Sequence, residues 1–209
     1  MIDAREQINA VRRTLGTRVL EAGEARELTI SQVYRTGLDD MWTVVTAPER
    51  IARWFLPVTG ELRPGGRYQL EGNAGGTVTA CERPRSYAAT WEFGDQISWI
   101  EVELTPEGPD RTRFSLTHIA HVDEHWGRFG PGATGVGWDS GLLGLAMHLA
   151  APESPRDDAA ILAWTASEDG TLFMKLSSDA WAEADIEAGE EPETARTRAA
   201  NTYAAYTGG

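Results

Sequence analysis

Three histidines lie close together in the sequence, and histidine is the side chain that most often exchanges protons or binds metal near neutral pH. His118, His121 and His125 fall within eight residues. On a continuous helix they would share a face and, with a fourth ligand, could bind zinc. The strand pattern before His118 ends there, however, and residues 119–133 follow as an irregular loop rich in glycine and proline. We therefore predict no metal site and no cofactor.

Three short motifs carry chemistry only in contexts that this sequence lacks. The segment GPGATG (130–135) has the glycine spacing of a dinucleotide fingerprint, but no parallel strand is expected before it. It therefore indicates a loop leading into a helix. The free amides at the start of that helix could hold an anionic group of a ligand. Asp139-Ser140-Gly141 resembles the nucleophile segment of trypsin-like proteases, yet it falls inside a helical pattern. Cys81 is the one cysteine, and we expect it to be a small buried hydrophobe.

Polar side chains also occur in phase with apolar ones on the expected strands. Gln32, Ser98, Thr112 and His118 all fall on faces that should be dry. Buried polar groups need partners, so these residues either satisfy one another or orient a bound ligand. If the chain is an enzyme, His118 or Asp139 is the candidate general acid or base.

The eight tryptophans are many for 209 residues. We expect Trp91 and Trp138 to face an interior cavity, and Trp42 and Trp54 to lie where two short helices meet its mouth. Ordinary core packing is the alternative, because aromatic side chains dominate core energetics in any case.

The spacing of apolar residues predicts the elements that would position these side chains. Alternation predicts a strand at 28–34 and an antiparallel meander from Pro57 to His118, with a hairpin turn at Pro64-Gly65-Gly66 between strands at 58–63 and 67–71. The helices expected from periodicity of three to four are the following: residues 4–20, two short helices between 39 and 55, 134–150, 167–188 with Ser167 as N-cap and Gly189 as stop, and 192–206.

Two features of these helices bear on packing. Helix 134–150 is apolar nearly all round and carries a glycine stripe at 137, 141 and 144, which indicates either close backbone packing or room for a ligand. Helix 167–188 has an apolar face with Phe173, Leu176 and Trp181, which must dock on the rest of the chain or on a second copy, so a homodimer is left open.

Composition excludes several classes of partner. The net charge is −13, and nucleic acids and anionic membranes both reward clustered Lys and Arg, so neither is expected as a partner. The single cysteine and the lack of an apolar leader or a membrane-length run favour the cytoplasm. The negative charge is concentrated in residues 151–209, which hold 12 acidic and 4 basic side chains.

The order strand, two short helices, antiparallel strands and long helix resembles the START/SRPBCC superfamily, which includes polyketide cyclases and activators of the heat-shock-protein-90 ATPase. The activator-like bacterial branch is the most similar. The segments that carry this resemblance are VYRTGLDDMWTVVTAPERIARWF (33–55), GELRPGGRYQL (60–70), ERPRSYAATWEF (82–93) and the Gly137-Trp138 pair. It implies an α+β helix-grip fold, with a curved six-stranded antiparallel sheet around a long helix and an apolar pocket between them.

The sequence thus predicts an N-terminal helix at 1–24, a helix-grip domain at 25–150 and an acidic helical extension at 151–209, packed on the domain or on a dimer mate. The favoured function is binding of a small, mostly apolar or aromatic molecule; a cyclase- or hydrolase-type enzyme and a chaperone-assisting interaction module are the alternatives. The expected ligand-binding residues are Gln32, Trp54, Trp91, Phe93, Ser98, Phe114, His118, Trp138 and Leu142.

Overall fold

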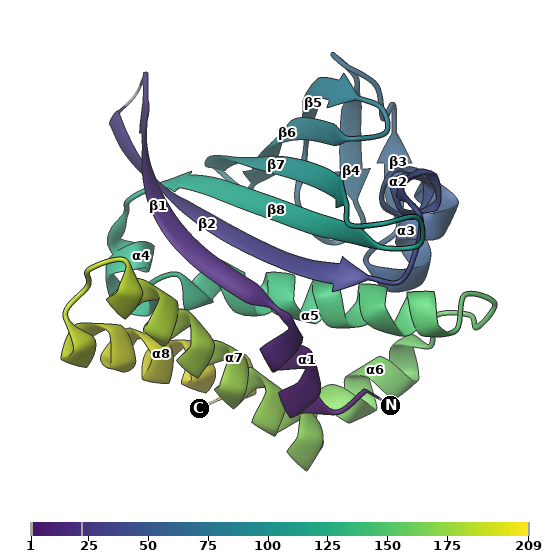
Figure 1. Ribbon diagram of the computed structural model, residues 1–209. Coiled ribbons are helices and arrows are strands. Elements are labelled where there is room, and N and C mark those ends of the chain that lie inside the picture. Colours follow the sequence, from purple (N-terminus) through teal and green to yellow (C-terminus); the bar gives the residue numbers. More distant parts are fainter. Residues whose placement is uncertain (1, 22, 209) are drawn as a thin grey trace. The chain divides into compact units, whose positions relative to one another are not determined.

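The computed structural model describes residues 2–21 and 23–208, and its contacts group the chain into two compact units. Unit 1 comprises residues 1–30, 121–143 and 157–209, and unit 2 comprises residues 31–120 and 144–156. The elements are coloured by sequence in Figure 1. The predicted domain boundaries at residues 24 and 150 stay a prediction.

The strands form one hydrogen-bonded sheet in the order β1-β2-β8-β7-β6-β5-β4-β3. Successive pairs from β3 to β8 are antiparallel. The strand bounds are β1 Arg12–Leu20, β2 Gly23–Tyr34, β3 Val58–Gly60, β4 Arg67–Leu70, β5 Gly75–Glu82, β6 Ser86–Phe93, β7 Gln96–Pro106 and β8 Thr112–His121.

The sheet has eight strands, so the expected count of six is wrong. One additional strand is β1, which we had assigned to a helix spanning residues 4–20; only α1 (Ala4–Ala10) is helical there. Three β-branched side chains and Gly16 lie within residues 12–20, and both residue classes favour extended pairing over a helix. The other is β3, which pairs with β4 and lies within the strand expected at 58–63, so the strand pattern of the meander contained it and only the count of six left it out.

The helices of unit 2 lie beside the meander. α3 (Pro48–Trp54) lies next to β3 at the edge of the sheet (Figure 1), and α2 (Leu38–Thr46) packs on α3 and contacts β7. Pro48 begins α3, where its missing amide costs nothing. Residues 144–150 are the second half of α5 (Gly132–Ala150), close to the expected helix 134–150. A Cβ at Gly144 would stand 2.3 Å from the carbonyl oxygen of Trp54, so this glycine serves close backbone packing.

Unit 1 is built on the tail helices, which the sequence located well. α7 (Glu168–Glu187) begins after Ser167, whose side chain accepts from the amide of Gly170, and α8 (Pro192–Thr207) packs along α7. Two helices were missed: α4 (Glu124–Phe129) lies in the expected loop 119–133, and α6 (Asp158–Thr165) follows the linker. Both are short and are capped by aspartate side chains, at Asp123 and Asp157, which we had read as loop residues.

Phe173 and Trp181 of α7 are fully buried. The Trp181 indole lies against the start of α5, where a Cβ at Gly135 would stand 2.3 Å from the ring. The glycines of GPGATG are therefore packing and turn positions: Gly130 ends α4 at a φ of 60°, and Gly132 lies against Thr202 of α8. No parallel strand precedes them in the described chain, as a dinucleotide fingerprint requires.

We predict opposite outcomes for two glycine-to-alanine substitutions in α5. Gly135→Ala should lower the free energy of unfolding by about 1–3 kcal/mol, because the new methyl group overlaps the buried indole of Trp181. Gly137→Ala, two residues on, meets only the Tyr206 hydroxyl at 3.4 Å and should be neutral or stabilising by up to about 1 kcal/mol. Urea unfolding of both variants tests this, and equal effects would show that the indole is not seated on Gly135.

Candidate functional site

The face of the unit 2 sheet that carries His118 is the candidate site. Alternation on β6, β7 and β8 places His118 on the same face as Ile100 and Leu116, and places Trp91 opposite Ser98 in the register of β6 and β7. We call this the inner face. Its apolar members Ala89, Ile100, Val102, Leu104, Phe114 and Leu116 are all buried.

A hydrogen-bonded pair lies within this apolar surface. His118 Nε2 is 2.9 Å from Ser98 Oγ, and the Ser98 hydroxyl donates to the carbonyl oxygen of Trp91 at 3.1 Å. When the single proton of Ser98 is directed to the carbonyl oxygen of Trp91, Nε2 of His118 is the donor between the two side chains, and the histidine then does not activate Ser98 as a nucleophile.

The histidine is held in its neutral form. His118 is 7% exposed, and burial lowers its pKa from 6.5 to about 4. The Trp91 ring meets the imidazole edge-on, with ring centroids 6.2 Å apart. Trp91 and Ser98 are only partly buried, so solvent reaches this end of the inner face.

The other polar residues expected on dry faces have partners. Tyr34 donates to Gln32 Oε1 at 3.0 Å, and Thr112 donates to the carbonyl oxygen of Thr36 at 2.9 Å. The hydrogen-bonding groups of these residues are therefore paired within the protein. Among the described side chains, no fully buried nitrogen or oxygen lacks a hydrogen-bond partner.

The remaining predicted ligand-binding residues are dispersed. Trp54 donates from Nε1 to the carbonyl oxygen of Val44, which fixes α3 on α2, and Phe114 is 2% exposed in the core. Phe93 is 58% exposed at the β6–β7 turn. Trp138 and Leu142 are buried in the first half of α5, which belongs to unit 1. Their part in ligand binding stays a prediction.

Asp139, the second candidate acid or base, belongs to a different environment. It is 1% exposed in unit 1, and the Arg13 guanidinium holds it through Nη2 at 2.7 Å and Nε at 3.1 Å. Ser177 donates to Oδ2 at 2.5 Å and the Trp181 indole donates to the same oxygen at 3.0 Å. Burial raises the pKa of Asp139 against the opposing effect of these donors. All four contacts need an acceptor, so this carboxyl is a structural junction.

The three histidines make separate contacts. His118 bonds Ser98, Nδ1 of His121 is 3.3 Å from the carbonyl oxygen of Glu24, and the ring of His125 lies 4.7 Å from that of Phe129. No group of three metal-ligating side chains gathers among the described residues. Cys81 is exposed on β5, so its expected burial is wrong; β5 is buried only over its first half.

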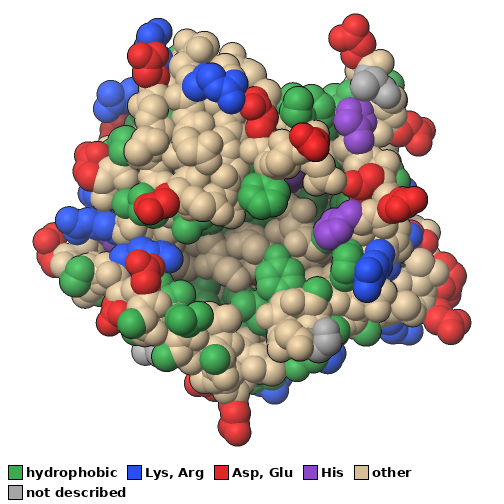
Figure 2. Space-filling model, turned by 180° about the vertical axis from the view of Figure 1, so that it is seen from behind, with side chains coloured by type: hydrophobic (Ala, Val, Ile, Leu, Met, Phe, Trp, Pro, Cys, Tyr) green, Lys and Arg blue, Asp and Glu red, His purple; other side chains and the backbone are tan. Residues whose placement is uncertain are grey.

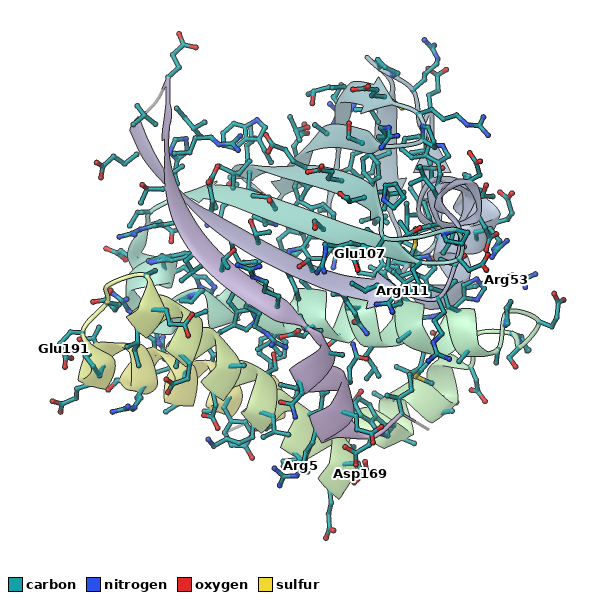
Figure 3. The ribbon with its side chains drawn as sticks, in the orientation of Figure 1. Arg5, Arg53, Glu107, Arg111, Asp169 and Glu191 are labelled. Atoms are coloured by element: carbon teal, nitrogen blue, oxygen red, sulfur yellow. The ribbon has the colours of Figure 1, made fainter. Side chains whose placement is uncertain are left out.

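Charged side chains lie on the surface in both units. Acidic and basic groups are interspersed over the face shown in Figure 2. The β7–β8 turn illustrates the pattern, since Glu107 lies beside Arg111 (Figure 3) with a closest approach of 3.9 Å and also pairs with Arg113. Arg53, at the end of α3, donates to the carbonyl oxygen of Pro152 at 2.8 Å. No helix in the described part of the chain has the length and apolar character needed to cross a membrane.

Comparison with known proteins identifies the family. Residues 35–150 match the family described as Activator of Hsp90 ATPase homolog 1-like protein. This match covers more than half of the chain, and the chain belongs to this family.

Solved structures extend the likeness beyond those residues. CalU16 from Micromonospora echinospora is 32% identical; its solution NMR structure has a TM-score of 0.69 over 87% of this chain and 97% of its own. Its crystal structure has a TM-score of 0.66 over 84% and 98%. DynU16, from the dynemicin biosynthetic locus, shares the fold at 18% identity, with a TM-score of 0.52 over 63% of this chain and 50% of its own. The comparison with curated proteins finds no match.

The first prediction for this site concerns pH. The pKa of His118 is about 4 in the folded chain and about 6.5 when unfolded, so the unfolded chain takes up the proton first as the pH falls. Stability should therefore fall between about pH 6.5 and pH 4, by on the order of 3 kcal/mol. His118→Gln keeps a donor for Ser98 without titrating, and it should flatten this loss in urea unfolding. Burial also lowers the pKa of His148, which adds a pH dependence of its own. The stability of the His118→Gln variant is therefore compared with that of the wild type at each pH.

The second prediction concerns the junction at Asp139. Arg13→Met leaves a buried carboxylate without its counter-charge and should destabilise the protein by about 3–5 kcal/mol. Adding Asp139→Leu should recover part of that loss, because no charge is then left buried, although Ser177 and Trp181 lose their acceptor. Chemical denaturation of the single and double variants measures this coupling. Additive losses would contradict it.

Proposed function

We propose that unit 2 binds a small, uncharged, mostly apolar or aromatic molecule on the inner face of its sheet. The observation that carries the proposal is the partly accessible Trp91 beside the Ser98–His118 pair, in a surface that is otherwise apolar. Ligand sites are commonly apolar with a few placed polar groups, and an aromatic face with one donor–acceptor pair matches that description. Membership of the family supports the fold that such a site needs.

The charge of the interior indicates which ligands the face accepts. The buried polar residues of unit 2 are Ser31, Gln32, Thr36, Thr112, His118 and His148. None of them carries a fixed charge, and the lowered pKa of His118 keeps it neutral at physiological pH. Burying an ionised ligand group without a counter-charge is costly, so an anionic or cationic molecule is disfavoured.

An enzyme using the predicted acid or base has less support. Ser98 directs its proton to a backbone carbonyl, and every contact of Asp139 holds unit 1 together. A chaperone-assisting role through the apolar face of α7 is also less favoured, because Phe173 and Trp181 of that face are buried within the chain itself.

A matched pair of fluorescent probes tests the proposal. N-phenyl-1-naphthylamine is uncharged, and 8-anilinonaphthalene-1-sulfonate has the same rings with one added negative charge. The native protein should bind the uncharged probe at least tenfold more tightly than the sulfonate, measured by fluorescence titration at pH 7.5.

Two tryptophan variants locate the binding. Trp91→Ala should weaken binding of the uncharged probe about tenfold, because it removes an aromatic wall of the inner face. Trp99→Ala, one strand away and on the opposite face by alternation, is the control and should leave the affinity unchanged. Failure of the wild type to bind the uncharged probe, or equal losses in the two variants, would refute the proposal.

A further inference from the structure

His148 is the second buried histidine of unit 2, and its hydrogen-bond partner is an arginine. It lies in the last turn of α5 and is 5% exposed. Arg50 of α3 donates from Nε to Nε2 of His148, and the two nitrogens are 3.4 Å apart. A guanidinium group has donors and no acceptor, so Nε2 must offer its lone pair and the imidazole must be neutral. This contact therefore exists in only one protonation state of the histidine.

The charges that face His148 come from every element packed around it. Arg50 and Arg53 belong to α3, Asp40 of α2 lies 3.8 Å from Arg50, and Glu153 follows the end of α5. Burial lowers the pKa of His148, the two arginines lower it further, and the two carboxylates act in the opposite direction. Asp40 and Glu153 are exposed to solvent, which screens their attraction. A proton added to His148 thus meets two cations and no buried counter-charge.

The helix that carries these arginines is held mainly by contacts at its ends and sides. None of the seven residues of α3 is buried, and a helix of this length has little stability of its own. Two side-chain hydrogen bonds join it to the end of α5 and the segment that follows: Arg50 to His148, and Arg53 to the carbonyl oxygen of Pro152 at 2.8 Å. Trp54 separately holds α3 on α2. Loss of the first pair of contacts would therefore free one side of α3.

We propose that Arg50 and His148 form an acid-sensitive latch, in which protonation of His148 breaks the contact and lets α3 open away from the end of α5. The protonated Nε2 is a donor that faces another donor, and two cations then stand side by side. A histidine freed from these contacts has a pKa of about 6.5, so the opened form takes up the proton first as the pH falls. The latch is therefore closed above about pH 6.5 and opens below it. This proposal does not depend on ligand binding by the inner face.

Amide hydrogen exchange of the native protein, followed by mass spectrometry, measures the opening directly. Exchange in residues 48–55 is recorded from pH 7.5 to pH 5.0, and each rate is divided by the intrinsic rate at that pH. Protection of these amides should fall about tenfold over this range, because protonation favours the opened form.

Three variants assign the effect to the latch. His148→Gln keeps an acceptor for Arg50 and does not titrate, so α3 should be protected as in the wild type at pH 7.5 and should stay so at pH 5.0. Arg50→Met removes the donor, and protection of α3 should already be reduced at pH 7.5. His118→Gln is the matched control: it removes the other buried histidine of unit 2 and should leave the pH dependence of α3 unchanged.

The possible results decide the matter in either direction. Equal protection of α3 in the wild type at pH 7.5 and pH 5.0 would overturn the proposal. So would a loss in His148→Gln as large as that in the wild type. A pH dependence that disappears in His118→Gln and persists in His148→Gln would place the sensor at His118 and also refute the latch.

Discussion

The ion pair between Arg13 and Asp139 is the interaction on which unit 1 depends. It joins β1 to the first half of α5, and Ser177 and Trp181 attach α7 to the same carboxylate. The remaining guanidinium donor is used as well, since Nη1 donates to the carbonyl oxygens of Ile8 and Val11 at the end of α1. A buried carboxylate is costly unless it is fully paired, so these segments must assemble together. The apolar burial of Trp181 and Phe173 then supplies the larger share of the stability.

The interior of unit 2, in contrast, contains almost no charged side chains. Its buried polar groups are hydroxyls, an amide and neutral imidazoles, each able to change partner at low cost. A fixed ion pair like that of Arg13 and Asp139 would hold a single arrangement and exclude an uncharged guest. An interior of neutral donors can instead exchange a contact within the chain for a contact with a ligand, which is the property that a binding face requires.

Local pattern predicted the elements whose signals lie within a few residues. The alternation of β6 to β8, the N-cap at Ser167 and the proline at the start of α8 are of this kind, and the structure confirms them. β1 was mistaken because Ile8, Val11, Leu15 and Val19 also match a helical period, and only pairing with β2 decides between the two. The partner of Asp139 could not be named, because Arg13 lies 126 residues away. A signal was present all the same: a lone carboxylate in an all-apolar helix must have a buried counter-charge.

The site was harder to predict than the fold for the same physical reason. His118 and Ser98 were correctly placed on one face by their phase, yet whether they satisfy each other or a ligand depends on proton direction, which phase does not reveal.

The likeness to CalU16 extends further along the chain than the family match does. The family match covers residues 35–150, little more than half of the chain, whereas the likeness to CalU16 covers at least 84% of it and nearly all of CalU16. Part of the chain outside residues 35–150 is therefore shared with CalU16, so the likeness is not confined to the family region. In unit 2, Gly144 of α5 packs against the backbone of Trp54 at the end of α3. Within unit 1 the tail is part of the folded structure, because Ser177 and Trp181 of α7 both donate to the buried carboxylate of Asp139.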